Sequence, residues 1–565
     1  MIRIKLICLI ILISISFKSK TQSSIVTTVH NMSVSGPGTV KANAESEICI
    51  FCHTPHNSRP DHPLWNRNDP GATYILYNSS TTQATIGQPD GSSVLCLSCH
   101  DGTIALGNVL SRTTNISFAG GVTTMPTGKS NLTTDLANDH PISFVYNSAL
   151  ATADGELKDP ATLTGTVKLE NSKMQCTSCH DPHQNLYTDF LVANSLNSEL
   201  CLNCHQKTYW NSTSHKTSTK TWNGTGTDPW QHTPATFTTV AQNACENCHN
   251  PHSAATKPRL MNFTPEENNC LDCHSGTVAA KNILAQFAKT NKHNVYGYTG
   301  IHDPNEANLA VTKHVECEDC HNPHAANATT AVAPFVNGFN AGVKGINQSG
   351  NPVDPALYES EICYRCHSGN TWAPAAATPR VIIQNNTRLE FANGNPSYHS
   401  VAAVGVNTSV PSLIAPWTIT SRIYCSDCHA SDGAAGTPVG PHGSTYPRIL
   451  KLQYLTANNT TESAAAYALC YSCHSRTSIM NDVSFKEHSK HIQGEKTPCN
   501  ACHDPHGISS TQGNSINNSN LINFWTGINT PSPGNGAIRF EDQGLYRGRC
   551  FLTCHGENHT GWNYP

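Results

Sequence analysis

The chain has 565 residues, 25 of them cysteines, and only 13% of its residues are charged, which gives a formal net charge of −4. This charge pattern excludes a nucleic-acid-binding surface and a polybasic membrane patch. The cysteine content excludes an ordinary cytosolic enzyme, because a reducing compartment leaves most thiols idle. Hydrophobic residues reach only 37%, and long periodic apolar segments are scarce for this length. Something other than side chains must therefore fill the interior.

The first segment has the layout of a secretory signal peptide. Arg3 and Lys5 precede an apolar run over 6–15, which is well short of the roughly 20 residues that a spanning helix needs. Cys8 stands near the start of this run, not after it, so it does not indicate a lipoprotein. The sequence predicts a signal peptide over 1–23 and a mature protein that is soluble outside the cytoplasm, without a membrane span.

All cysteines except Cys8 belong to pairs that are followed at once by histidine. This is the pattern of covalent haem attachment, in which two thiols one turn apart form thioethers and the next residue directs its imidazole at the iron. A single such pair favours a zinc knuckle or a thioredoxin-like redox site. Twelve copies in an exported chain favour haem c instead, about twelve groups in all, covalently attached.

Eleven motifs read C-x-x-C-H, and the twelfth, at Cys550, carries one extra residue that must bulge if both thioethers are to form. The expected thioether cysteines and proximal histidines are Cys49, Cys52 and His53; Cys96, Cys99 and His100; Cys176, Cys179 and His180; Cys201, Cys204 and His205; Cys245, Cys248 and His249; Cys270, Cys273 and His274; Cys317, Cys320 and His321; Cys363, Cys366 and His367; Cys425, Cys428 and His429; Cys470, Cys473 and His474; Cys499, Cys502 and His503; and Cys550, Cys554 and His555.

Histidine is also the expected sixth ligand. Only five methionines follow the signal segment, whereas eighteen of the thirty histidines remain after the twelve proximal ones. Bis-histidine ligation therefore predicts lower potentials than histidine–methionine ligation does.

An internal repeat supplies the candidates for the distal ligands. Five motifs continue as C-H-x-P-H, each is followed by a second motif, and further histidines stand upstream. In the fifth repeat, the Pro-His pair follows an apparent ten-residue insertion. The choice stays open between His302 and His314 in repeat four and between His488 and His491 in repeat six, while His62, His215, His293 and His559 are left over. The distal candidates are His30, His56, His140, His183, His232, His252, His302, His314, His324, His399, His442, His488, His491 and His506.

These motifs resemble those of the multihaem c-type cytochromes with doubled CXXCH motifs, over nearly all of the mature chain. The resemblance implies a haem-cored, mostly irregular coil with closely stacked haems and long-range electron transfer. We expect short helices of one to three turns at the cysteines, a few short β-hairpins, a brief strand near Val167, and an elongated row of six tandem dihaem units. Their predicted boundaries are 24–137, 138–225, 226–298, 299–395, 396–482 and 483–565.

The leading functional hypothesis is an electron conduit that is not an enzyme. Its partners would be redox proteins or other cytochromes and an extracellular acceptor, with no nucleic acid, and the cell surface is slightly favoured over the periplasm. Self-association into a conductive filament is a further hypothesis, with His30 as the histidine that would complete a haem of a neighbouring copy. One alternative is a multihaem reductase of nitrogen or sulfur oxyanions, although the sequence has no C-x-x-C-K variant of the motif to support it. The other is a periplasmic electron-storage cytochrome. Haem would do the redox chemistry in each case.

Overall fold

The computed structural model describes residues 24–306, 313–370, 376, 378–434, 436–534 and 536–564. The predicted signal peptide lies outside these residues. The chain forms two compact lobes. The N-terminal lobe holds residues up to Gln206 together with His249–Asn262, and the C-terminal lobe holds Lys207–Cys248 together with Phe263 onward. Each lobe is described by itself.

Regular structure is sparse, and coil dominates both lobes. The N-terminal lobe contains the α-helices α2 (Gly91–His100), α3 (Ser148–Asp154) and α4 (Cys176–Cys179). The C-terminal lobe contains α5 (Ser214–Thr217), α6 (Val240–Asn243), α7 (Asn268–His274), α8 (Leu284–Phe287), α9 (Glu359–His367), α10 (Thr387–Glu390), α11 (Ala468–Tyr471) and α12 (Arg476–Met480). Single 3₁₀ turns carry many of the remaining motif cysteines: Cys49–Phe51, Cys201–Asn203, Ala244–Asn247, Cys317–Asp319, Cys425–Asp427 and Cys499–Ala501.

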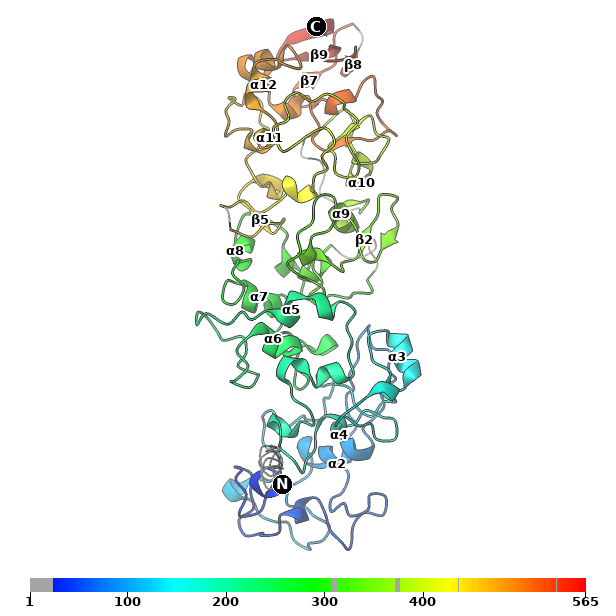
Figure 1. The fold of residues 1–565 in the computed structure, drawn as a ribbon, viewed down its shortest axis with the longest axis vertical. Coiled ribbons are helices and arrows are strands. Elements are labelled where there is room, and N and C mark those ends of the chain that lie inside the picture. Colours follow the sequence, from blue (N-terminus) through cyan, green and yellow to red (C-terminus); the bar gives the residue numbers. More distant parts are fainter. Residues whose placement is uncertain are drawn as a thin grey trace, which may run out of the picture. The chain divides into compact units, whose positions relative to one another are not determined.

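The strands are short and antiparallel, and all ten lie in the C-terminal lobe among the described residues. Three two-residue pairs join β1 (Asn291–Lys292) to β5 (Gly443–Ser444), β2 (Gly345–Ile346) to β3 (Pro352–Val353), and β4 (Ser397–Tyr398) to β6 (Gly507–Ile508). The fourth sheet, close to the C-terminus in Figure 1, consists of β7 (Asn529–Thr530), β8 (Arg539–Asp542), β9 (Gly548–Cys554) and β10 (Glu557–Tyr564).

The strand expected near Val167 does not form. Val167 is instead buried in extended coil, where it packs with Phe144 and Tyr146. Its β-branched side chain fits the sequence pattern for a strand, but the residues that follow form only isolated bridges, from Lys173 to Glu170 and to Val145.

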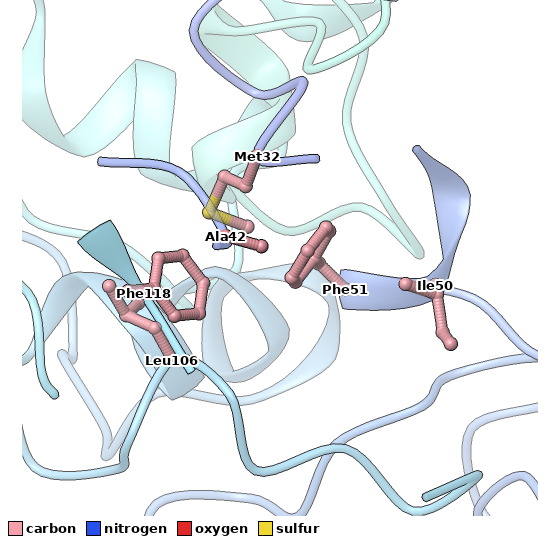
Figure 2. Close-up of a cluster of buried hydrophobic side chains, with 6 residues drawn as sticks. All are labelled: Met32, Ala42, Ile50, Phe51, Leu106 and Phe118. Atoms are coloured by element: carbon pink, nitrogen blue, oxygen red, sulfur yellow. The ribbon is translucent and has the colours of Figure 1, made fainter. Parts of the chain in front are cut away.

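Buried apolar side chains are divided among nine small clusters in the described residues, in place of one continuous core. Figure 2 shows one of them, in which Phe51 and Phe118 pack edge to face below Met32. Cys52 and Cys99, from two different motifs, pack against this cluster. The apolar side chains therefore form small clusters next to the motifs, as expected of a haem-cored fold. No helix in the described ranges is long and apolar enough to cross a bilayer.

Candidate haem-binding sites

Eleven of the twelve motifs begin in a helical turn. The turn brings the two thiols to one side and lets the histidine amide donate to the carbonyl of the first cysteine, as His53 does to Cys49 at 2.8 Å and His429 to Cys425 at 2.9 Å. None of the twenty-four described cysteines forms a disulfide. The twelfth motif differs, because Cys550 and Cys554 lie on strand β9.

Ten motif histidines face a second histidine within their own lobe, with ring centroids 6.0–6.5 Å apart. Two metal–nitrogen bonds of about 2 Å each, plus the half-widths of two imidazole rings, place the centroids of ligands on opposite sides of one metal ion about 6 Å apart. The pairs, with the motif histidine first, are His53–His183, His100–His30, His180–His252, His205–His140, His274–His215, His321–His442, His367–His293, His429–His506, His474–His399 and His503–His488.

Rings in ordinary aromatic contact can also lie this far apart. The hydrogen bonds of the rings therefore decide whether a pair is arranged as metal ligands. In most of these histidines Nδ1 is engaged, usually by a carbonyl oxygen, which leaves Nε2 free for a metal. On the motif side, His100 donates to Ser130 at 2.7 Å and His321 to Phe339 at 2.8 Å. Such second partners fix the orientation of the ring.

The x-Pro-His segment of one repeat makes two contacts with histidines of the haem sites in the repeat before it. Its histidine faces the first motif histidine of the preceding repeat, as His183 faces His53 and His506 faces His429. Its proline carbonyl accepts from Nδ1 of the histidine that faces the second motif of that preceding repeat. The donors and acceptors are His30 to Pro182 at 3.2 Å, His215 to Pro323 at 2.8 Å, His293 to Pro441 at 2.9 Å, and His399 to Pro505.

Burial favours the neutral form of several facing histidines. Burial, followed by the second imidazole, lowers the pKa of His274, His367 and His474 to about 4. A neutral imidazole has the lone pair that a metal requires. The residues present therefore fit haem iron with two axial imidazoles.

Two distal histidines have a carboxylate as second partner. His506 Nδ1 donates to Glu390 at 3.0 Å, and His252 Nδ1 donates to Asp139 at 3.1 Å. Burial alone would lower the pKa of His506, but the hydrogen bond to Glu390 raises it above its usual value. A carboxylate partner makes an imidazole a stronger electron donor to its metal.

Several sequence candidates lie elsewhere. His302 and His314 belong to an acidic cluster, where His302 Nδ1 is 3.1 Å from Glu316 and His314 Nε2 is 3.2 Å from Glu306, and Arg365 is 3.4 Å from Glu306. The carboxylates of this cluster therefore engage both imidazoles.

Two more candidates have other surroundings. His232 Nε2 donates to the Glu246 carbonyl at 2.7 Å, and His56 is exposed. The amide of His324 donates to Asn322 at 3.0 Å, as the amides of the paired His183 and His252 donate to Asp181 and Asn250. His30, expected to reach a neighbouring copy, faces His100 of its own chain.

Three histidines that were left over in the sequence take up paired positions: His215, His293 and His559. A signal in the sequence could have found the first two. In the first five repeats, the histidine that faces the second motif lies 19–36 residues before the first cysteine of that repeat, whereas His232, His302 and His314 lie closer.

The motif cysteines of successive motifs also lie next to one another. Within a repeat the second cysteines meet, so that the thiol of one raises the pKa of the other, as with Cys52–Cys99, Cys179–Cys204, Cys248–Cys273, Cys320–Cys366, Cys428–Cys473 and Cys502–Cys554. Between repeats the first cysteines lie close enough to shift each other's pKa, in Cys96–Cys176, Cys270–Cys317, Cys363–Cys425 and Cys470–Cys499. Within each lobe, the motifs therefore follow one another in space in the order of the sequence.

The chain is a multihaem c-type cytochrome, as the motif cysteines and their facing histidines indicate. It matches the family model described as the doubled CXXCH motif over residues 170–209, 238–279 and 419–478. It also matches the N-terminal region of the NapC/NirT cytochrome c family over residues 449–531.

A curated relative is the multiheme cytochrome MtrA of Shewanella baltica (strain OS185), which is 24% identical over 201 residues. The match covers 35% of this chain and half of the relative's length.

Proposed function

We propose that the chain is an electron-transfer conduit in which about twelve haems, in six tandem dihaem repeats, form a continuous series. The single observation that supports it best is the ordered contact of motif cysteines in each lobe, from Cys52 to Cys204 and from Cys248 to Cys554. Bound haem supplies the one-electron iron couple. The chain's own residues set its spacing, its two imidazoles and its electrostatics.

The test is to interrupt the series in the middle. In the Cys317→Ala/Cys320→Ala chain, repeat four loses one attachment site, so electrons from a reductant on one side must bypass a gap. Conductance of a protein film and stopped-flow reduction are measured on this variant and on Cys49→Ala/Cys52→Ala, which removes the first motif instead.

We expect a fall of at least tenfold in conductance for the middle variant and a much smaller change for the first-motif variant. Equal conductance in the wild type and the middle variant would contradict the conduit. The same result, with each haem reduced independently by the soluble donor, would support electron storage instead.

An electron carrier is favoured over a reductase by the same pairs. At ten motifs two facing imidazoles could hold both axial positions of a haem iron, which would leave no open position there for a substrate. We further propose export by the segment 1–23 and electron delivery to a redox partner or acceptor outside the cytoplasm.

Self-association into a filament is a second candidate, and the observation that favours it is the surplus x-Pro-His segment of the first repeat. Pro55 and His56 are exposed. In a filament, His56 rather than His30 would contact a neighbouring copy. Light scattering of wild-type and His56→Ala protein at high concentration tests this, and filaments that persist unchanged in the variant would contradict a role for His56.

A further inference from the structure

Two carboxylates and an imidazole converge in the C-terminal lobe, at the first motif of repeat four. His302 Nδ1 is 3.1 Å from Glu316 Oε2 and 4.0 Å from Asp319 Oδ1, and one ligand atom from each of the three residues lies within 4.8 Å of the other two. Glu316 immediately precedes the 3₁₀ turn Cys317–Asp319, and Asp319 ends it. The turn that carries the first motif cysteine therefore also presents two carboxylates to one imidazole.

Backbone hydrogen bonds fix these three side chains in a buried position. Glu316 is 3% exposed, Asp319 is 7% exposed and His302 is 8% exposed. The amide of Glu316 donates to Asp319 Oδ2 at 2.8 Å, and the amide of His302 donates to Glu266 Oε2 at 2.6 Å. Because the backbone engages Asp319 Oδ2, the other oxygen of this carboxylate is the one that faces His302.

The surrounding side chains carry an excess of negative charge. Arg365 is 3.4 Å from Glu306 and 3.4 Å from Asp319, and with Glu266 and Glu316 the carboxylates number four. Burying carboxylates is costly unless each is paired with a cation or a donor. Even if both imidazoles were protonated, one negative charge would remain uncompensated within this group. We call the group the acidic cluster: Glu266, His302, Glu306, His314, Glu316, Asp319 and Arg365.

One carboxylate oxygen of the cluster is buried without a hydrogen-bond partner among the described residues. Glu316 Oε1 is shielded from solvent and unpaired, whereas Oε2 of the same group lies 3.1 Å from His302 and 3.8 Å from His314. Leaving a buried acceptor unsatisfied costs free energy, and more so when it is charged. A bound cation would satisfy this oxygen and reduce the excess charge at the same time.

The donor atoms are spaced as the ligands of one small divalent cation. Zinc bonds to nitrogen and oxygen are about 2.1 Å long, so two atoms bound to the same ion lie at most about 4.2 Å apart. The distances from His302 Nδ1 to Glu316 and to Asp319, 3.1 Å and 4.0 Å, fall within this limit. An imidazole with two carboxylates suits zinc, whereas calcium prefers oxygen ligands alone.

We propose that His302, Glu316 and Asp319 bind one divalent cation, with Zn²⁺ as the best match, at a site separate from the haem irons. The site gives His302 a role other than that of a distal haem ligand. The cation joins His302 to the turn that carries Cys317, so its binding stabilises the fold around that motif. The proposal does not depend on whether the haems conduct.

The first experiment counts zinc on holo-protein with its full haem content, because free motif thiols and unligated histidines would bind zinc themselves. The protein is stripped with a chelator, dialysed against buffered submicromolar Zn²⁺ and analysed for zinc and iron by mass spectrometry. We expect one zinc per chain in the wild type and at least a tenfold lower content in Glu316→Gln. A wild type without zinc, or a variant that keeps it, would overturn the proposal.

Asp69→Asn is the control variant, because Asp61, His62 and Asp69 form another triad of one histidine and two carboxylates. Arg59 already pairs with both of these carboxylates, and Asp61 is exposed. We expect this variant to keep its zinc. If Asp69→Asn lost the zinc, the metal would belong to that triad and the assignment to His302 would be wrong.

Two measurements remain decisive if Glu316→Gln folds poorly. X-ray absorption at the zinc edge of the wild-type holo-protein should show nitrogen and oxygen ligands with a single imidazole. Sulfur ligands, or two imidazoles, would place the metal elsewhere and overturn the proposal. Zinc should also raise the melting temperature of the stripped wild-type holo-protein. An unchanged melting temperature at saturating zinc would contradict a site that joins His302 to the motif turn.

Discussion

The ring of His30 donates from Nδ1 to the carbonyl oxygen of Pro182 at 3.2 Å, across 152 residues of sequence. The residue after this proline, His183, faces His53, while His30 itself faces His100. One dipeptide therefore supports two different axial positions of the preceding repeat. The first prediction tests this arrangement directly.

Replacing His183 with alanine should open an axial position in the first repeat, not in the second. We expect His183→Ala to give one high-spin haem, because His53 loses the imidazole that faces it. His56→Ala is the matched control, since it changes the same position of the same C-H-x-P-H pattern. A high-spin signal in His56→Ala and none in His183→Ala would reverse the assignment.

Replacing Glu390 with glutamine should raise the potential of the haem between His429 and His506. The carboxylate accepts the Nδ1 proton of His506 at 3.0 Å and strengthens this ligand. A stronger electron donor favours ferric over ferrous iron, and a tenfold loss of this preference would raise the potential by about 60 mV for one electron. Spectroelectrochemistry should show one haem shifted upward in Glu390→Gln and none in Glu462→Gln, whose carboxylate pairs with Arg476. An unshifted titration in Glu390→Gln would exclude this tuning.

Protein without haem should not fold cooperatively. The side chains form nine separate clusters in the described residues, and several contain only three fully buried members. Structural metal sites similarly couple binding to folding. Circular dichroism of a chain expressed without haem attachment should change gradually with temperature, while the holo-protein melts in a transition. A sharp transition in the haem-free chain would contradict this view.

The ion pair of Lys289 and Asp432 should make stability depend on acid pH. The two side chains are 2.7 Å apart and mostly buried. Burial alone would raise the pKa of Asp432, but hydrogen bonds from Lys289 and Thr445 lower it to about 2. Because the folded pKa is below the unfolded value of 3.8, the stabilisation is complete above about pH 4 and is lost as the pH falls toward 2.

Lys289→Met should therefore lose about 1–2 kcal/mol at neutral pH and less at pH 2.5. Denaturant unfolding of both proteins at the two values measures this difference. The surface pair of Lys257 and Asp135 supplies a control, since Lys257→Met removes a more exposed ion pair. An equal loss for Lys289→Met at both pH values would contradict the coupling.

The sequence alone indicates the motif cysteines, because their chemistry is local. Two thiols and an imidazole within five residues need only one turn of chain, so Cys49 and His53 could be assigned without a structure. The coil-rich fold followed from composition for a similar reason, since few segments have enough apolar periodicity for a longer helix.

The facing histidines could not be predicted in the same way. His293 faces His367 because the Pro441 carbonyl, 148 residues away, orients its ring. His314 stands next to its motif in sequence, yet the carboxylates of Glu306 and Glu316 engage it. Proximity in sequence is a poor guide to the distal position, because that ligand comes from long-range packing.

The sequence pattern also did not reveal the carbonyl groups that accept hydrogen bonds from the motif histidines. His180, His249 and His429 each donate from Nδ1 to a carbonyl 9–19 residues downstream. The accepting residues, such as Asp189 and Arg448, have φ near +60° and are followed by a second residue in the same region. No glycine marks these positions, so turn chemistry does not reveal them.

Each x-Pro-His segment after the first supplies and orients histidines for the repeat before it. The haem sites can therefore be completed only in the order of the repeats. During synthesis, the first motif of a repeat emerges before the histidine that faces it, as His53 precedes His183 and His321 precedes His442. If the exported chain folds from its N-terminus, the last folded repeat would therefore have an incompletely ligated site until the next repeat joins it. A truncation between repeats would leave that defect permanently, so the protein can be shortened or extended only by changes that also supply a closing segment.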